Sequence, residues 1–427
     1  MRTRPTSLVA YIATVHGLIH TIEMTYAALL SRIDDEFGAG LFVLGIVANV
    51  FAFGFGFSAL PSGFLVDRLG SQRVLTIAFG LAAVAALLVA TSPNTAMLAV
   101  FLGLLGLSIG LYHPAGISLI AQATAGPDGG RGLALGWHGV AGNLGIAVAP
   151  VLAIGVAEAL DWRWAYVLLA ILALLAALSL RLVSLPRAGP FGVEAREAEP
   201  PREPVRTATD RPRSGSGLLA FAPLLLVYGV FVLNGFVYRG SLTFLPVHIE
   251  ENVSVSWFGL DEAWLAGSLT TLALLAGAFG QLFGGAMSER HRLERLAVPL
   301  TFSMLPFLLL MGLTTGLPLV LFSALFVFAN FSSQPVYTGL IADYSPERAL
   351  GRSYGISFFA AFGIGSAAAT VAGFFADRWG TDAVYQALAG FVLVTLTLSI
   401  TIWRLSERSR RDAPPHRETP ATGWGGE

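Results

Sequence analysis

The sequence predicts an all-α integral membrane protein with about twelve transmembrane helices in two pseudo-symmetric bundles of six. Three observations predict this class. The chain of 427 residues is 55% hydrophobic and only 12% charged, whereas soluble domains carry about 25% charged residues. Apolar runs of about 20 residues, the length that crosses a bilayer as a helix, recur along the chain. Matching residues in the two halves indicate that one unit is repeated.

The apolar runs come in two sets of six, separated by a polar segment. They cover residues 8–30, 41–62, 74–92, 95–122, 132–157, 163–185, 218–246, 262–288, 296–315, 318–342, 353–376 and 383–404. The first run reaches Leu30 without a small-residue cleavage site, so we interpret it as a retained helix and not as a signal peptide. Proline or glycine inside several runs predicts tilted or kinked helices.

The polar segment and the loop charges predict the domain organisation. We expect an N-terminal bundle over residues 1–185, a disordered linker over 186–217, a C-terminal bundle over 218–404 and a tail over 405–427. The linker and tail have too little apolar content to fold. Arginine gathers in the loops on one side and acidic residues in the opposite loops, which predicts that linker, tail and both termini are cytoplasmic. The expected location is the inner, cytoplasmic membrane.

The two halves share residues at a nearly constant offset. The offset is 222 (285 − 63) for a charged loop, in which Gly63, Asp67, Arg68 and Arg73 stand opposite Gly285, Glu289, Arg290 and Arg295. It is 221 (334 − 113) for two polar-proline pairs, His113-Pro114 and Gln334-Pro335. An offset of 216 aligns Ile33 with Ile249 (249 − 33) and also Glu23 with Arg239 (239 − 23). Several such pairs in order predict a duplicated six-helix unit.

The charged loop after the second run carries the most specific motif. It reads Gly63-x3-Asp67-Arg68-x-Gly70-x-x-Arg73, and it must lie at a membrane surface because charges are costly in hydrocarbon. Its first glycine would let two helices approach closely, and its second would allow a sharp reversal. The pattern resembles the signature loop of the major facilitator superfamily of transporters. The second copy, with Glu289 and Arg290, lacks the later glycine.

The resemblance implies two parallel six-helix halves with a substrate site near the membrane midplane between them. It also implies that Asp67 contacts Arg131, Arg352 or a helix N-terminus of the other half when the cytoplasmic side is closed. Asp377, near a span end, is expected to be only a surface anchor.

Two further likenesses bear on the direction of transport. The fragments Tyr112-His-Pro-Ala-Gly116 and Arg239-Gly-x-Leu-Thr-Phe-Leu-Pro246 are similar to bacterial relatives of fosmidomycin-resistance exporters, which implies efflux. The fifth run, with glycines at 136, 139, 142 and 145, resembles the antiporter motif of drug exporters only in part, because Ala149 replaces an expected glycine. Close helix packing is the other interpretation of these glycines.

Polar residues inside the apolar runs are the candidate site. His16, His20 and Glu23 lie on one face of the first helix, at i, i+4 and i+7. Intramembrane polar groups face the protein interior or a cavity. His113 precedes a proline that frees the carbonyl of residue 110 and kinks the fourth helix. Arg239, in the seventh run, must find a partner or bind an anion.

These observations predict a secondary transporter, and not an enzyme, for a small anionic organic solute or drug, moved by alternating access with proton coupling. The predicted substrate and coupling residues are His16, His20, Glu23, His113, Arg239 and Gln334, and the predicted gating residues are Gly63, Asp67, Arg68, Gly70, Arg73, Glu289 and Arg290. The expected partners are the substrate, protons and the lipid bilayer. We expect no nucleic acid, no cofactor, no resident metal and a monomer.

The mechanism expected from the offset pairs the two buried charges. Arg239 would bind the anionic group of the substrate, and Glu23 would take up a proton when that pairing is displaced, with His20 as relay. A permanent structural ion pair is the alternative interpretation. Three alternative functions remain. A divalent-metal transporter or a metal-dependent membrane enzyme would each use His16, His20 and Glu23 as metal ligands. The third alternative is a receptor-like protein. The sequence has no lysine, so it has no phosphate-binding loop for ATP.

Overall fold

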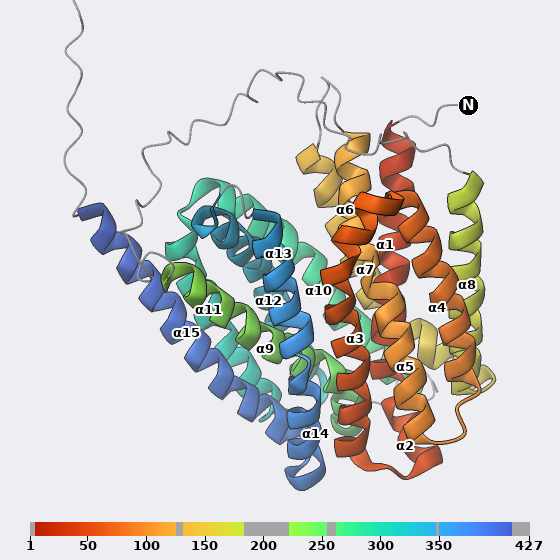
Figure 1. Cartoon of the computed structure of the whole chain (residues 1–427). Helices are drawn as coiled ribbons and strands as arrows, with labels where there is room; N and C mark the ends of the chain where they lie inside the picture. The colour runs from red at the N-terminus through yellow and green to blue at the C-terminus, as the bar shows by residue number, and fades with distance from the viewer. Residues whose placement is uncertain (1–4, 125–130, 183–221, 254–261, 347–349, 412–427) are drawn as a thin grey trace, which may run out of the picture.

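The computed structural model describes residues 5–124, 131–182, 222–253, 262–346 and 350–411. Within these ranges every regular element is a helix (Figure 1). The predicted linker over 186–217 lies outside the described residues. The helices of the first half are α1 (Pro5–Ala28), α2 (Leu30–Phe37), α3 (Gly40–Leu69), α4 (Ser71–Ala90), α5 (Thr95–Gly110), α6 (Tyr112–Ala123), α7 (Arg131–Ala159) and α8 (Trp162–Leu182).

The second half repeats this arrangement. Its helices are α9 (Ala222–Asn252), α10 (Glu262–Arg290), α11 (Leu293–Met311), α12 (Gly316–Tyr344), α13 (Leu350–Phe358), the π-helix η4 (Phe359–Ile364), α14 (Ala367–Trp379) and α15 (Thr381–Arg411). The last helix continues seven residues beyond the predicted boundary at 404 (411 − 404). Glu407 in this extension pairs with Arg292 at 2.5 Å and with Arg295 at 3.0 Å. These ion pairs explain why residues 405–411 are helical and not part of a disordered tail.

Eleven helical stretches of the described chain are long and apolar enough to cross a membrane. Helices α5 and α6 form one of them, and α13, η4 and α14 form another. Helix α1 does not reach the same hydropathy because it carries His16, His20 and Glu23, yet its 24 residues pack among the others. With α1 the total is twelve (11 + 1), so the prediction of about twelve spans is confirmed.

Two spans are broken where the sequence weakens the helix. Helix α5 ends at Gly110 and α6 begins at Tyr112, as expected from a proline at position 114 that leaves the carbonyl of residue 110 without its usual donor. The eleventh span contains the π-helix η4, an element that often marks functional positions. In contrast, Pro335 lies inside an unbroken α12.

The glycines of the signature loop have different roles. Gly70 takes φ 82° and so lets the chain reverse between α3 and α4, as the sequence predicts. Gly63 differs from expectation, because a Cβ added there would meet nothing within 4 Å. The close helix approach expected at Gly63 is therefore wrong for this conformation, in which that end of α3 is exposed.

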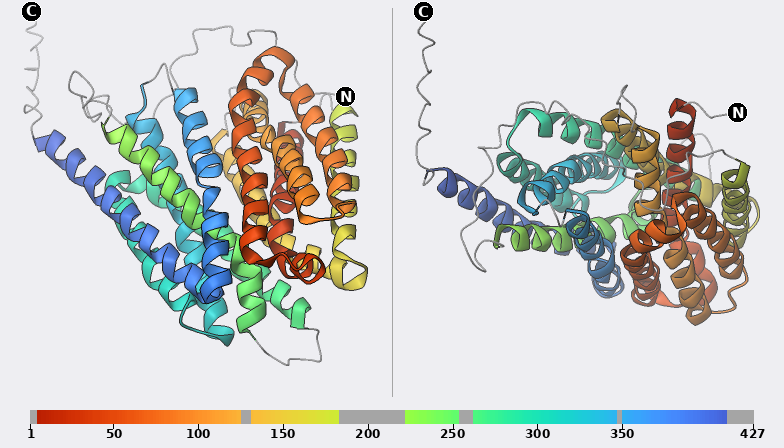
Figure 2. Two further views of the ribbon diagram at one scale, coloured as in Figure 1. Left: turned by 60° about the horizontal axis from the view of Figure 1, so that its bottom comes forward. Right: turned by 45° about the horizontal axis from the view of Figure 1, so that its top comes forward.

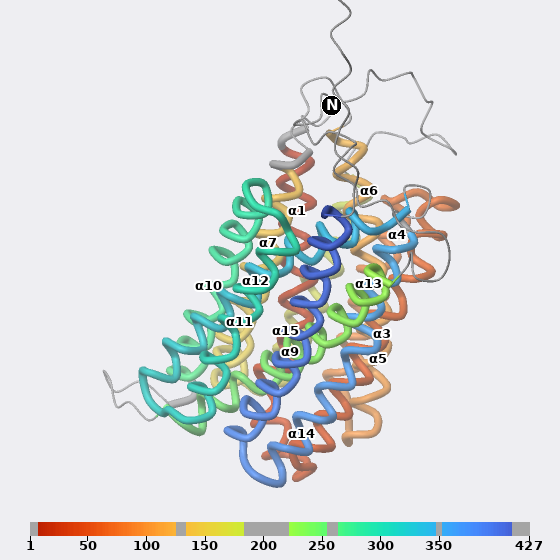
Figure 3. Tube along the Cα trace, turned by 90° about the vertical axis from the view of Figure 1, so that its left-hand side faces the viewer, coloured from red at the N-terminus to blue at the C-terminus, as the bar shows by residue number. Residues whose placement is uncertain are grey.

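The two halves lie side by side, and α9 and α15 slant together across the C-terminal half (Figures 1 and 2). The N-terminal and C-terminal halves contact each other at three places: α3 packs on η4 and α14, α7 packs on α10, and α1 packs on α9. Figure 3 shows α10 and α7 near each other on one flank of the molecule. The site of interest lies where α1 meets α9.

Candidate functional site

A buried ion pair joins the two halves at the centre of the molecule. Arg239 on α9 donates from Nη2 to Oε1 of Glu23 on α1. The Glu23 side chain is fully buried and the Arg239 side chain is 6% exposed. A buried pair of this kind is costly to break from one side, because the remaining charge loses its partner. The sequence repeat aligns Glu23 with Arg239 at equivalent positions of the two halves, and in the structure the two side chains are in contact.

A line of histidines extends from Glu23. His20 Nδ1 lies 2.5 Å from Glu23 Oε2, and His20 Nε2 lies 3.1 Å from His16 Nε2. His16 donates through Nδ1–H to the backbone carbonyl of His138, at 2.7 Å, and its Nε2 lies 3.4 Å from His113 Nε2. Helical spacing places Glu23, His20 and His16 on one face of α1, and the kink before α6 presents His113 to the same face. The sequence-predicted histidines therefore form one cluster.

Glycines of α7 make room for this cluster. A Cβ at Gly142 would stand 2.6 Å from Cε1 of His16, and one at Gly145 would stand 2.0 Å from the carbonyl oxygen of Gly17. The glycine-rich fifth span thus allows close packing of α7 on α1, one of its two predicted interpretations. Gly136 is different, since a Cβ there would meet nothing within 4 Å.

His138 and Tyr112 complete the cluster and were not among the predicted site residues. The His138 ring stacks on His16 with ring centres 3.6 Å apart. The hydroxyl of Tyr112 donates to the carbonyl of Ile12 at 2.7 Å and lies 3.3 Å from His138 Nε2. Sequence alone gave no reason to place His138 here, because its position early in the fifth run suggested the cytoplasmic surface.

Aromatic rings surround the Arg239 guanidinium. Its Cζ lies 5.7 Å from the ring centres of Tyr238 and Phe362 and 5.9 Å from that of Phe55. His113 also packs against Phe55, with ring centres 5.3 Å apart. In the part of the chain that the structure describes, Arg239 Nε and His113 Nδ1 are buried and have no hydrogen-bond partner. Unpaired buried polar atoms are costly, and a ligand or an ordered water at this place would satisfy both.

Among the described residues, no hydrogen bond, ion pair or ring contact joins the remaining predicted residues to the cluster. Gln334 lies on α12, where its backbone carbonyl accepts a hydrogen bond from the hydroxyl of Thr338 at 2.8 Å. Arg73, Glu289 and Arg290 are exposed near the helix ends that carry the signature loop and its repeat.

Asp67 and Arg68 are exposed at the end of α3. Arg68 lies over the ring of Phe64, 4.0 Å from its centre. Among the described residues Asp67 forms no ion pair, and the side chain of Arg131 lies outside them. The gating contact of Asp67 with the other half therefore stays a prediction for another conformation.

At the opposite end the halves are tied together by polar contacts. Arg32 on α2 pairs with Glu158 of its own half at 2.7 Å and with Glu250 of the other half at 2.9 Å. Asp377, at the end of α14, accepts from the backbone N–H of Leu41 at 2.9 Å. A carboxylate at the N-terminus of α3 is favoured by the helix dipole. Asp377 is thus more than a surface anchor, and its Asp-Arg-x-Gly sequence, the same as at Asp67, could have pointed to it.

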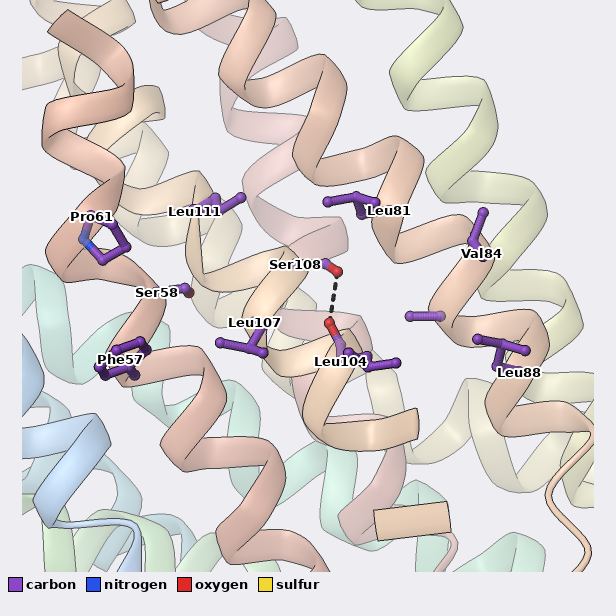
Figure 4. Close-up of a pocket in the computed structure, with 11 residues that line it drawn as sticks. Phe57, Ser58, Pro61, Leu81, Val84, Leu88, Leu104, Leu107, Ser108 and Leu111 are labelled. Atoms are coloured by element: carbon purple, nitrogen blue, oxygen red, sulfur yellow. Dashed lines mark hydrogen bonds between the residues drawn. The ribbon is translucent and has the colours of Figure 1, made fainter. Parts of the chain in front are cut away.

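A cavity of about 390 Å³ lies between α3, α4 and α5 and contains none of the predicted site residues (Figure 4). Its lining is almost entirely apolar and includes the exposed side chains of Leu81, Val84 and Leu104. The two serines that line the cavity donate to carbonyls of their own helices, Ser108 to Leu104 at 2.7 Å and Ser58 to Phe55 at 3.2 Å. A surface of this composition suits lipid contact, so we place the functional site at the Glu23–Arg239 pair.

Comparisons with known proteins agree with the fold. The family model of the Major Facilitator Superfamily matches residues 12–265 and 258–425. The chain is similar to the "probable sulfoacetate transporter" of Cupriavidus necator, at 26% identity over 64% of this chain and 61% of that one. It is similar to the D-galactonate transporter of Escherichia coli, at 23% identity over 89% of this chain and 90% of that one.

Among solved structures, a bacterial homologue of the human lysosomal transporter Spinster, in an inward-facing and occupied conformation, matches with a TM-score of 0.72. The match covers 97% of this chain and 100% of that one at 13% identity, so it shows the fold alone. The family match extends over nearly the whole chain, and the relatives are transporters. The chain belongs to the Major Facilitator Superfamily, and it is a multi-pass membrane protein.

Proposed function

We propose that this protein is a transporter that moves a small organic anion by alternating access and couples the movement to protons. The observation that carries the proposal is the buried ion pair between Glu23 on α1 and Arg239 on α9, which links the two halves near the centre of the molecule. Substrates of this fold bind between the halves. An arginine at that place is suited to bind a carboxylate or similar group, since its planar guanidinium offers several donors.

The anion would compete with Glu23 for the guanidinium. Arg239 Nε already lacks a partner within the described chain, so an incoming carboxylate gains a charged hydrogen bond there. Glu23, once displaced, would be a buried carboxylate without its counter-charge, a costly state that uptake of a proton relieves. His20, 2.5 Å from Glu23, is placed to deliver that proton. Substrate binding and protonation are coupled in this way through one arginine.

Two relatives support an anionic substrate. Their names denote sulfoacetate and D-galactonate, both of which are organic anions at neutral pH. The match to the D-galactonate transporter extends over most of both chains, whereas the match to the sulfoacetate transporter covers 61% of that protein. Neither name refers to a metal ion, so the divalent-metal alternative gains no support from them.

The proposal includes an orientation and a conformation. We place both termini, the linker and the tail in the cytoplasm and the protein in the inner membrane, because arginine is concentrated in the loops on that side. With this orientation, the hydrogen bonds of Glu250 and Asp377 hold the two halves together on the side of the membrane opposite the cytoplasm. This conformation corresponds to one open towards the cytoplasm. We also propose that the protein works as a monomer.

Ligand-dependent thermal unfolding of the purified protein tests the substrate class. A ligand that binds only the folded state, at about 100 times its Kd, stabilises that state by about 2.7 kcal/mol. D-galactonate and sulfoacetate should raise the unfolding temperature of the wild type, and neutral D-galactose should not. Arg239→Gln should abolish the rise. Stabilisation by neutral sugars alone, or equal stabilisation of Arg239→Gln by the anions, would contradict the proposal.

A further inference from the structure

The contacts among His16, His20 and Glu23 define how many protons this cluster holds. Three hydrogen-bond contacts run in series, from the carbonyl of His138 to His16, from His16 to His20, and from His20 to Glu23. Each of these contacts needs one hydrogen between its two heavy atoms, because two lone pairs that face each other repel.

The outer two contacts fix two hydrogens. A backbone carbonyl only accepts, so the Nδ1 of His16, 2.7 Å from the oxygen of His138, carries a hydrogen. The contact of 2.5 Å between His20 Nδ1 and Glu23 Oε2 also contains a hydrogen, whether it rests on the imidazole or on the carboxyl group. Two neutral imidazoles and an ionised carboxylate have only these two hydrogens to offer.

The middle contact therefore needs a third hydrogen or a cation, because ring nitrogens of His16, His20 and His113 all lie within 4.8 Å of one another and could also hold a metal ion. His16 Nε2 and His20 Nε2 face each other at 3.1 Å, a normal distance for an N–H···N hydrogen bond. We propose that the His16–His20–Glu23 unit binds one extra proton, held in the bridge between His16 and His20, and that this is the proton which transport uses. The use assigned to the proton rests on the proposed function, whereas its presence is measured without any substrate.

Charges around the bridge agree with such a proton. The titratable and charged groups that face it are Glu23 on its own helix, Tyr112 and His113 on α6, His138 on α7, and Tyr238 and Arg239 on α9. Glu23 and Arg239 cancel, so the extra proton gives the site a net charge of +1 (−1 + 1 + 1). A monovalent anion bound at Arg239 makes the site neutral. The proton thus binds before the anion. It increases the affinity of the site for the anion, because its positive charge, like that of Arg239, attracts negative charge.

Loss of the proton has a structural consequence. Without it the lone pairs of His16 and His20 would face each other at 3.1 Å, so one ring has to turn away. His20 would then lose its alignment with Glu23, and the route for the proton would be interrupted. The bridge between the two imidazoles is therefore present only in the proton-loaded state.

Nitrogen-15 NMR of ring-labelled histidine, in lipid bilayers and without substrate, tests this inference. At about pH 8 an ordinary imidazole, with a pKa of about 6.5, is neutral. We expect the wild type, after treatment with a chelator, to show one protonated Nε2 at this pH with a through-hydrogen-bond coupling to a second Nε2. His16→Asn and His20→Asn should each lose the coupling. His291→Asn, at an exposed position, is the matched control and should retain it.

Two further variants test which group supplies the hydrogen between His16 and His20. His113→Asn should retain the coupling, and its loss there would show that the hydrogen belongs to His113, which overturns the proposal. Glu23→Gln can donate from its amide to His20 Nδ1 and so supplies the third hydrogen permanently. The bridge should disappear from the wild type at high pH and persist in Glu23→Gln.

The inference and the proposed function fail separately. Unprotonated Nε2 atoms on both His16 and His20 in the chelator-treated wild type at about pH 8, where free imidazole is neutral, would overturn the inference whatever the protein transports. A metal ion that copurifies and whose removal changes these signals would overturn it as well. A bridge proton together with no proton-driven transport of any anion would leave the inference intact and refute the proposed function.

Discussion

Replacement of Gly45 by alanine should force the two halves apart at the end where Asp377 contacts α3. Gly45 on α3 packs directly on α14 of the other half. A Cβ at this position would lie 2.4 Å from the carbonyl oxygen of Ala369 and 3.4 Å from Cα of Gly373. Both neighbours are backbone atoms, so no side chain can turn away to accommodate the methyl group.

The size of the effect follows from this overlap. Overpacking of a well-packed contact costs about 1–3 kcal/mol. The cost applies only while the halves touch at this level, so it acts on the equilibrium between the two transport conformations. Gly45→Ala should shift that equilibrium by about 5- to 150-fold towards the form open at the Asp377 end.

Distance measurements between spin labels can detect this shift. The chain has no cysteine, so Leu160→Cys and Leu313→Cys provide two label sites without prior removal of thiols. They are 66% and 70% exposed and follow α7 and α11, one in each half. Gly80→Ala is the matched control, because a Cβ there meets nothing within 4 Å. A distance distribution that is the same in Gly45→Ala and Gly80→Ala would refute the reasoning.

Three further outcomes are expected. Asp67→Asn should shift the same distance distribution in the opposite direction, towards the form closed at the Asp377 end; an unchanged distribution and unchanged transport would contradict a gating role. A chelator should leave the thermal unfolding of wild type and His20→Ala unchanged, and stoichiometric zinc that is lost in His20→Ala would reverse this. Arg163, which donates to Glu36 at 2.5 and 2.6 Å, holds the pKa of Glu36 below its usual value. The ion pair therefore stabilises the folded protein at pH values above the unfolded pKa of Glu36, about 4.3, and this stabilisation is lost as the pH falls through the lower folded pKa. In equilibrium unfolding measured against pH, Arg163→Gln should weaken this loss of stability in acid.

The long-range pattern of the sequence predicted most of the fold. Hydrophobic run length predicted the spans, and the repeat offset placed Glu23 and Arg239 at equivalent positions, where the structure has an ion pair. Both signals are long and regular, so a few irregular residues do not obscure them. Helix α1 shows the limit of hydropathy alone, because its buried polar residues lower the average of a helix that is surrounded by protein.

Contacts that depend on the mutual orientation of helices could not be derived from the sequence. His138 stacks on His16 only because Gly142 and Gly145 let α7 approach α1. Asp377 looked like a surface residue, since its Asp-Arg-x-Gly sequence marks a special position but does not identify the N-terminus of α3 as its partner. The role expected for Gly63 was wrong in this conformation because close approach depends on which end of the molecule is closed.

Transport by Glu23→Gln in proteoliposomes tests the central claim most directly. The substrate is the anion that stabilises the wild type, with D-galactonate tried first, and a pH gradient provides the driving force. Glu23→Gln should exchange the anion across the membrane yet fail to accumulate it, because the variant cannot alternate between charged and protonated states. Arg239→Ala should lose both activities. Accumulation against a gradient by Glu23→Gln at the wild-type rate would show that Glu23 is not the coupling acid.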